Sequence, residues 1–322
     1  MPAGDVSRTL CFEQFKREVT AQIRAYWYFA TAAKFTDRWW EHVIRTEGAK
    51  ATITKYDATA GMPYAAVDLS PNVYRGLPAQ ALPLLVNNTI IAISTALEVY
   101  LTGVCRRVVF LRPELTKSSE RSFTAGEVSS VITTREPARH RFASMFAEKL
   151  TRNRPDRDVV KATLGLIHRS LGKDEDLIIS RWVVWGYVRN ALVHAGGLVT
   201  SDLVAKAPSR FTEVDEPLNL KDRDLMRCQS AALSLASAVD EQVVRSIVDL
   251  EDCSLLTREL FVRFGMDDRR ELASIVSMSL NAKFGAGAVQ KVLDQHKKLG
   301  TKPEFEGVTF SGEFLRSVVE RG

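Results

Sequence analysis

The chain has 322 residues, of which 45% are hydrophobic and 26% are charged, and its formal net charge is +5. This length and composition suffice for one large domain or two small ones, and they exclude a disordered chain. The basic excess, with a pI of about 9.0, permits binding to a polyanion such as a nucleic acid without requiring it.

Apolar residues recur at spacings of three and four along most of the chain, which predicts helices rather than strands. We expect a long helix over 12–46, then a turn-rich boundary over 48–80, where Gly, Pro, Asp and Ser gather. A second long helix is expected over 82–111, ended by Pro113. Further helices are expected, in chain order, at 139–152, 156–171, 174–195, 222–250, 254–264, 267–283, 286–298 and 312–320.

Two segments are expected to be loops. Residues 115–138 are rich in Ser, Thr, Arg and Glu and are expected to hold at most a short strand at VSSVITT, residues 128–134. Residues 197–220 contain two prolines and are expected to be a loop between helices. Strand signals are otherwise few, so we predict an all-α fold, a bundle with helical additions at both ends.

The apolar run over 82–104 is long enough to span a membrane, but Asn87, Asn88 and Glu98 would be costly in lipid. We therefore expect a buried core helix, a cytoplasmic protein and no membrane partner. The cysteines form no CxxC pair, so we expect free thiols and no metal site. They are Cys11, Cys105, Cys228 and Cys253.

Motifs for nucleotide cofactors and hydrolytic catalysis do not occur. The chain has no phosphate-binding loop, and GAGAV at 285–289 lacks the full glycine pattern for dinucleotide binding. No GxSxG or HExxH motif is present. We interpret Asp222 and Asp224 as charges that cap the start of a helix rather than as metal ligands. We accordingly expect no cofactor.

One helix ends in an unusual set of polar residues. The segment 174–197 begins with acidic residues, which suit a helix N-terminus, and it stops at Gly196–Gly197, which suits a left-handed cap. Asn190 and His194 share a face with Gly186, one turn earlier. Because glycine costs about 1 kcal/mol inside a helix, we expect Gly186 to mark a close approach of another backbone or a ligand.

Arg189 lies beside Asn190 at this helix end, where the partial negative charge favours cationic side chains. A protonated His194 can donate a proton to a leaving oxygen, while Arg189 stabilises negative charge on phosphorus. Arginine and histidine also gather at helix C-termini as simple caps, so a phosphate site and a capping role both stay open. The same spacing at Arg135–His140 contains Pro137, and we discount it.

The sequence RNALVHAGG at 189–197 resembles the signature of HEPN domains (higher eukaryotes and prokaryotes nucleotide-binding). That signature is an arginine, a polar residue, about three further residues and a histidine, often followed by a glycine-containing turn. TALEVYL at 95–101 is similar to a helix of many HEPN domains that carries an acidic residue, here Glu98. The resemblance covers about 80–252 and implies a HEPN-like bundle of four or five helices. The flanks 1–79 and 253–322 are expected to be a helical extension and a small helical region.

The resemblance implies a metal-independent endoribonuclease that works as a homodimer. HEPN ribonucleases usually form one composite site from two facing motifs, and they use the ribose 2′-hydroxyl as nucleophile. His194 is then the general acid or base, Arg189 stabilises the transition state, and Asn190 orients the phosphate or the other chain's histidine. Such proteins often act as toxins or in antiviral defence, so we expect RNA as a partner, together with a protein regulator or antitoxin.

The residues give their own reason for a dimer, because one chain offers one convincing histidine and in-line attack is helped by both a base and an acid. Glu98 either pairs with Arg189 or is an isolated surface acid. The stretch 135–161, with eight Lys and Arg against four acids, either follows RNA or is a solvated face. An aromatic cluster either stacks bases or belongs to the core: Tyr26, Trp27, Tyr28, Trp39 and Trp40.

Two rival functions stay open. The first is a non-catalytic HEPN-like module that binds nucleotides or a protein, and the second is a structural helical protein whose terminal extensions are its working surfaces.

Overall fold

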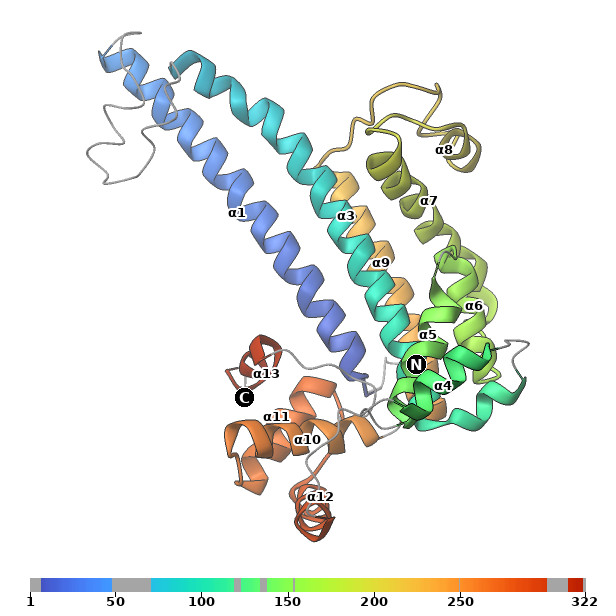
Figure 1. The fold of residues 1–322 in the computed structure, drawn as a ribbon. Coiled ribbons are helices and arrows are strands. Elements are labelled where there is room, and N and C mark those ends of the chain that lie inside the picture. Colours follow the sequence, from blue (N-terminus) through green and yellow to red (C-terminus); the bar gives the residue numbers. More distant parts are fainter. Residues whose placement is uncertain are drawn as a thin grey trace. The chain divides into compact units, whose positions relative to one another are not determined.

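A computed structural model describes residues 7–47, 71–118, 123–133, 138–152, 154–248, 250–299 and 312–320. Within these residues the regular elements are helices, apart from an isolated antiparallel bridge between Leu198 and Pro217. Figure 1 shows their course along the chain. The all-α class predicted from the sequence is therefore confirmed, whereas the HEPN-like arrangement stays a prediction.

The helices follow one another in this order. They are α1 (Leu10–Glu47), α3 (Pro71–Leu111), the 3-10 turn η1 (Pro113–Ser118), α4 (Ala125–Thr133), α5 (Ala138–Thr151), α6 (Asp156–Leu166), the 3-10 turn η2 (Gly172–Asp174), α7 (Glu175–His194), α8 (Ser201–Lys206), α9 (Asp222–Val243), the π-helical turn η3 (Val244–Val248), α10 (Glu251–Phe264), α11 (Arg269–Leu280), α12 (Ala286–Leu299) and α13 (Gly312–Val319).

The chain forms two compact units. Unit 1 consists of Met1–Glu18, Ser94–Tyr187 and Ser230–Gly322. Unit 2 consists of Val19–Ile93 and Val188–Gln229. The long helices α1, α3, α7 and α9 each have one end in each unit, so the units interleave along the sequence. The three segments expected from the sequence, 1–79, 80–252 and 253–322, stay a prediction.

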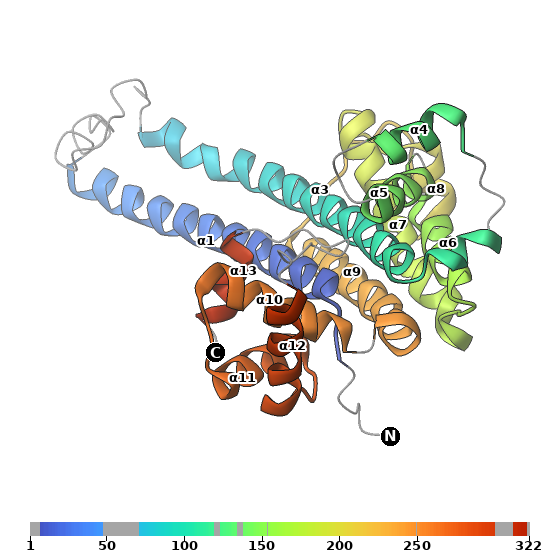
Figure 2. The same cartoon turned by 60° about the horizontal axis from the view of Figure 1, so that its bottom comes forward.

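Unit 1 contains two groups of helices. Residues of α3, α5 and α6 form a buried apolar cluster that includes Cys105, Val109, Phe146 and Leu150. In the other group, α10, α11 and α12 pack against one another and α13 packs on α11, as Figure 2 shows. In unit 2, α1 and α3 run side by side in both views.

Helix α4 corrects the expectation of a loop or short strand at 115–138. Thr124 and Glu127 form a reciprocal capping box: the Thr124 N–H donates to Glu127 Oε2 (2.7 Å), and the Glu127 N–H donates to Thr124 Oγ1 (3.2 Å). This arrangement satisfies two free N–H groups at a helix start and so favours a helix over a strand. Residues 119–122 and 134–137, including Arg135, lie outside the described part.

Helix α3 begins at Pro71, although the sequence predicted turns as far as residue 80. Proline suits the first turn of a helix, and Pro78 and Pro83 are accommodated further along it. Residues 48–70 of the expected boundary lie outside the described part. Gly76–Leu111 is long and apolar enough to cross a membrane by length and composition alone, with 44% of its most apolar window buried. A core helix of a soluble protein meets the same criterion.

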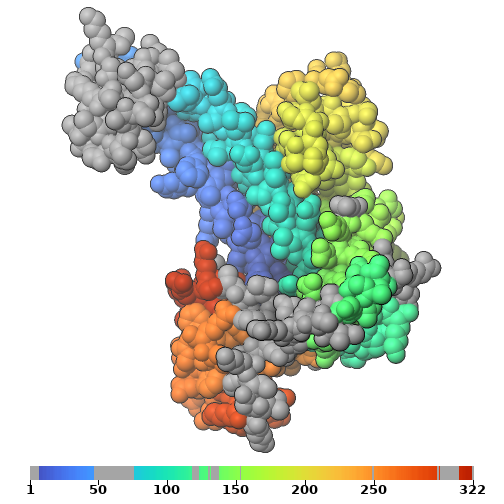
Figure 3. All heavy atoms as spheres, viewed as in Figure 1, coloured from blue at the N-terminus to red at the C-terminus, as the bar shows by residue number. Residues whose placement is uncertain are grey.

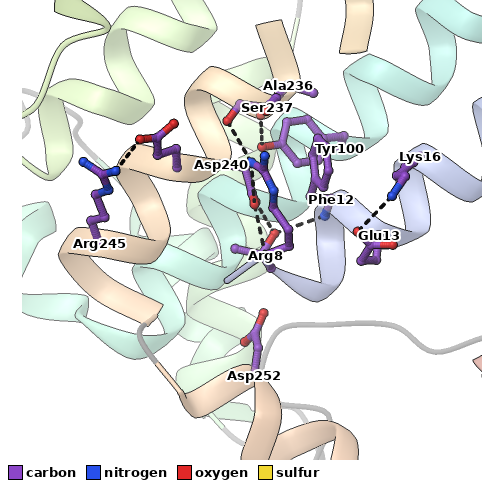
Figure 4. Close-up of polar contacts among 12 residues, drawn as sticks. Arg8, Phe12, Glu13, Lys16, Tyr100, Ala236, Ser237, Asp240, Arg245 and Asp252 are labelled. Atoms are coloured by element: carbon purple, nitrogen blue, oxygen red, sulfur yellow. Dashed lines mark hydrogen bonds and ion pairs between the residues drawn. The ribbon is translucent and has the colours of Figure 1, made fainter. Parts of the chain in front are cut away.

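A buried polar cluster joins four helices of unit 1, and Figure 4 shows the part of it around Asp240. Asp252 of α10 accepts hydrogen bonds from the Leu10 N–H at the start of α1 (2.9 Å) and from Arg107 Nε of α3 (2.8 Å). Arg107 Nη2 lies 2.6 Å from the same carboxylate, and both side chains are almost fully buried. Asp240 of α9 accepts from the Thr9 N–H (3.1 Å) and from the Thr9 hydroxyl.

Ionisation within this cluster is shifted. Burial raises the pKa of Asp240 to about 7, against the opposing effect of its hydrogen bonds from Thr9 and of nearby Arg8. The four cysteines are free and buried, which agrees with the expectation of free thiols. Burial raises the pKa of Cys11 and of Cys105 to about 12.

We predict that Arg107→Met destabilises unit 1 by about 3–5 kcal/mol, because it leaves the Asp252 carboxylate buried without its cation. The free energy of unfolding in urea, followed by circular dichroism, measures the loss. Arg152→Met is the matched control, since Arg152 forms an exposed pair with Glu148 at 3.9 Å that contributes little. Equal small losses in both variants would contradict a structural role for the buried pair.

A second prediction concerns pH. The folded-state pKa of Asp240 lies above its ordinary value of 3.8, so its contribution to stability is fully present below pH 4 and is lost as the pH rises toward 7. Between pH 5 and 7 this loss is on the order of 2 kcal/mol. Asp240→Asn can keep a bond from the Thr9 N–H without titrating, so its urea midpoint should fall less over this range. If the urea midpoints of the wild type and of Asp240→Asn fall equally between pH 5 and 7, Asp240 does not have a raised pKa.

Candidate functional site

The candidate site is at the C-terminal end of α7, the helix predicted over 174–195. Its first turn carries Glu175 and Asp176, which suit the positive end of a helix dipole. In the N-terminal half, Trp182 Nε1 donates to Asp156 Oδ2 of α6 at 2.6 Å, and Trp185 is buried. These aromatic contacts hold the first part of α7 in unit 1, whereas Val188 and the residues after it belong to unit 2.

Two glycines end the helix, as predicted. Gly196 and Gly197 have φ values of +62° and +81°, in the left-handed region that other residues rarely adopt. The carbonyl of Ala191 accepts from the Ala195 N–H (3.1 Å) and from the Gly197 N–H (3.0 Å). The turn therefore closes onto the last carbonyls of the helix and directs the chain away directly after His194.

The structure brings Arg189 and Asn190 together. Arg189 Nη1 donates to Asn190 Oδ1 at 3.2 Å, in an exposed setting, while Arg189 Nε is buried. The Asn190 amide oxygen thus lies against one edge of the guanidinium, at the exposed end of the helix.

His194 is exposed, one helical turn beyond the exposed Asn190. Because residues four apart lie on the same side of a helix, the two side chains share one face. The imidazole is accessible to a large substrate or to another protein chain. One chain thus presents an arginine, an amide and an imidazole within a turn and a half of helix.

Gly186 corrects part of the sequence interpretation. Apart from the backbone of α7 itself, a Cβ atom built at this position meets no heavy atom of the described residues within 4 Å. The close approach expected at Gly186 is therefore not made by any part of the chain that the structure describes.

The segment that follows the site was expected to be only a loop. Residues after Gly197 pair with a returning strand-like segment: the Val199 N–H donates to the Glu216 carbonyl (2.8 Å), and the Leu218 N–H donates to the Gly197 carbonyl (2.8 Å). This pairing brings Asp215 and Glu216, both exposed, close in space to the end of α7. Local periodicity gives no signal for this pairing, because it joins short irregular segments.

The other candidates have structural partners. In the stretch 135–161, Arg139 donates to the carbonyls of Phe110 and Leu111 at the end of α3, and three further cations lie near acids: Lys149, Arg152 and Lys161. Because these cations have acidic or carbonyl partners within the chain, the contacts favour the interpretation as a solvated face. Glu98 is exposed on α3, in unit 1, and its pairing with Arg189 stays a prediction.

The aspartates at the start of α9 act within the fold. Asp222 accepts a hydrogen bond from the Tyr26 hydroxyl. Asp224 accepts from the Lys221 N–H at 3.0 Å and pairs with Arg210 at 3.1 Å. The bond from the Lys221 N–H agrees with the interpretation of Asp224 as a helix-start residue, whereas Asp222 contacts α1 instead. Among the described residues, no group of three or more His, Cys, Asp or Glu side chains is arranged to hold a metal ion.

No protein-family model, curated protein or solved structure matches the chain significantly. The resemblance to HEPN domains thus rests on the residues quoted above and stays a prediction.

We predict that Gly186→Ala stabilises the isolated chain by about 1 kcal/mol, because alanine favours helix and meets free space. If a second copy approaches this position, the same variant should weaken self-association by roughly tenfold to a hundredfold. Urea unfolding and analytical ultracentrifugation measure the two effects. Gly165→Ala in α6, where a Cβ also meets nothing within 4 Å, is the matched control. Stabilisation with unchanged self-association would show that no second copy packs there.

Proposed function

We propose that the protein is a metal-independent endoribonuclease whose active site is completed by a second copy of the chain. The observation that supports this most is the exposed end of α7, where Arg189 bonds to Asn190 and His194 lies one turn away. A cation, an amide and an imidazole are the groups that phosphodiester cleavage needs if no metal takes part.

In the proposed reaction, a neutral His194 takes the proton from a ribose 2′-hydroxyl. The 2′-oxygen then forms a bond to phosphorus while the bond from phosphorus to the 5′-oxygen breaks. A protonated His194 of the second copy gives its proton to the departing 5′-oxygen. The products are a 2′,3′-cyclic phosphate and a 5′-hydroxyl, and the net proton count is unchanged.

Arg189 supplies positive charge where the phosphorane-like transition state gains negative charge. Asn190 holds the guanidinium through its Oδ1 and leaves its amide N–H groups for a phosphate oxygen. The open space at Gly186, on the same face as Asn190 and His194, leaves room for a second chain or for RNA. The proposal thus gives a role to each polar residue at the helix end and to Gly186.

The dimer follows from the chemistry. A single His194 cannot be both base and acid in the same step, and a two-fold axis through the site supplies two copies of it. The symmetric arrangement places the same helix end on both sides of the phosphorus. Roles as a toxin or in antiviral defence are further expectations from the resemblance alone.

The decisive experiment is cleavage of a structured RNA and of an oligouridine in the presence of EDTA. We predict that His194→Ala lowers the rate by about 10²–10⁴-fold, as removal of a general acid or base does. Arg189→Ala should lower it by about 10²–10³-fold through loss of charge stabilisation. The product ends should be a 2′,3′-cyclic phosphate and a 5′-hydroxyl, identified by mass spectrometry.

His140→Ala is the matched control, because His140 completes the other Arg-x4-His spacing in the chain. Its activity should equal that of the wild type. Thermal unfolding of each variant shows that the fold is kept. RNA binding without cleavage by the wild type would instead favour a non-catalytic binding module, and full activity of His194→Ala would rule out the assigned site.

A further inference from the structure

Helix α1 presents an exposed set of large apolar side chains that are all aromatic. Among the described residues of this helix, the exposed large hydrophobic side chains are Trp27 (38%), Tyr28 (71%), Phe29 (53%), Phe35 (72%) and Trp39 (38%). Tyr26 and Trp40, in contrast, are buried. The aromatic cluster seen in the sequence therefore divides into two core residues and an exposed set, and Phe35 joins that set.

Three of these rings share one face. Tyr28, Phe35 and Trp39 are spaced by seven and four residues, so at about 100° per residue they fall within roughly 40° of one another. They extend over about 16 Å of helix. Figure 3 shows much of the length of α1 (blue) at the surface of the molecule.

Positive charge lies on the same face. Arg24 is four residues before Tyr28, and Arg38 is three residues after Phe35, and both arginines are exposed. Asp37 and Glu41 each follow a ring of this face by two positions, about 160° around the helix from it, and Glu41, three residues after Arg38, pairs with Arg45 at 2.8 Å. We call Arg24, Tyr28, Phe35, Arg38 and Trp39 the aromatic face.

We propose that the aromatic face binds single-stranded RNA, with bases stacked on its rings and phosphates near its arginines. The inference rests on the proposed ribonuclease function, and the face lies in unit 2, which also contains Arg189, Asn190 and His194. Rings interleaved with arginines are what sequence-independent binding of single strands requires, because every base has a flat π-face and every linkage a negative charge.

Other occupants fit the face less well. Helices that insert into a lipid surface usually mix aliphatic side chains with aromatic ones, whereas the exposed large apolar set on α1 contains no aliphatic residue. A second copy of the same face would oppose arginines to a surface that is itself positive. Single-stranded RNA, which carries both flat bases and negative phosphates, matches both the aromatic rings and the positive charge of the face.

The test measures binding of a labelled oligouridine by fluorescence anisotropy in a His194→Ala background, so that no RNA is cut. Single variants Tyr28→Leu, Phe35→Leu and Trp39→Leu keep an apolar side chain and remove the ring. Each should raise the Kd by about tenfold, since base stacking on a ring contributes substantially. Trp27→Leu is the matched control and should bind like the parent, because this exposed ring is turned about 100° from Tyr28 and contacts the buried Tyr26 ring rather than a ring of the aromatic face.

The arginines give an independent readout. Arg24→Ala and Arg38→Ala should each lower the slope of log affinity against log salt concentration by about 0.7, as loss of one phosphate contact on a single strand does. Arg→Lys at the same positions should restore the slope. Duplex RNA of the same length should bind more weakly than the single strand, because its bases are not free to stack.

The outcomes separate the two proposals. Ring-dependent RNA binding without any cleavage by the wild type supports the aromatic face and contradicts the nuclease. Cleavage together with unchanged Kd in the leucine variants contradicts the aromatic face and leaves the nuclease standing. The inference is also overturned if the leucine variants still bind RNA but lose binding to phosphatidylserine vesicles, or change from dimer to monomer in light scattering.

Discussion

A single buried ion pair, Arg107 with Asp252, sets the arrangement of unit 1. Both side chains are almost without solvent contact, so each charge depends on the other for stability. Asp252 also accepts the Leu10 N–H, which ties the first turn of α1 to α10, and Asp240 fixes Thr9 in the same way. These bonds therefore fix how four helices from distant parts of the sequence are shifted along their axes relative to one another. Apolar contacts alone tolerate sliding of helices, whereas these directional bonds do not.

Most helices could be predicted from the sequence, because apolar residues three and four positions apart occur within each helical segment. The expected helix over 12–46 matches α1, and that over 174–195 matches α7. Helix α4 was not predicted, because the segment is rich in Ser and Thr, which are typical of loops. Thr124 and Glu127 nevertheless have the spacing of a capping box. The start of α3 was missed because the Gly, Pro, Asp and Ser residues of 48–80 were interpreted as turns. The interleaving of the units could not be predicted, since it depends on contacts between segments remote in sequence.

The candidate site was predictable only as far as one helix reaches. The Gly196–Gly197 turn and the shared face of Asn190 and His194 follow from spacing, and the structure agrees with both. The bond from Arg189 to Asn190 and the nearby acidic segment around Asp215 required coordinates, because side-chain conformation and non-local pairing leave no local pattern. At Gly186 the sequence predicted a close neighbour, and no described residue of the chain is that neighbour. A single sequence does not show which other molecule would approach there.

The four buried thiols have a practical consequence. Cys11, Cys105 and Cys253 belong to unit 1, whereas Cys228 belongs to unit 2. Burial keeps such thiols protonated and shielded, so an alkylating reagent reaches them only when the surrounding structure opens. The rate at which each cysteine is modified then reports the opening of its own unit. Each unit therefore contains its own buried thiol, and peptide mass spectrometry can measure the alkylation rates of the two units separately in the wild-type protein.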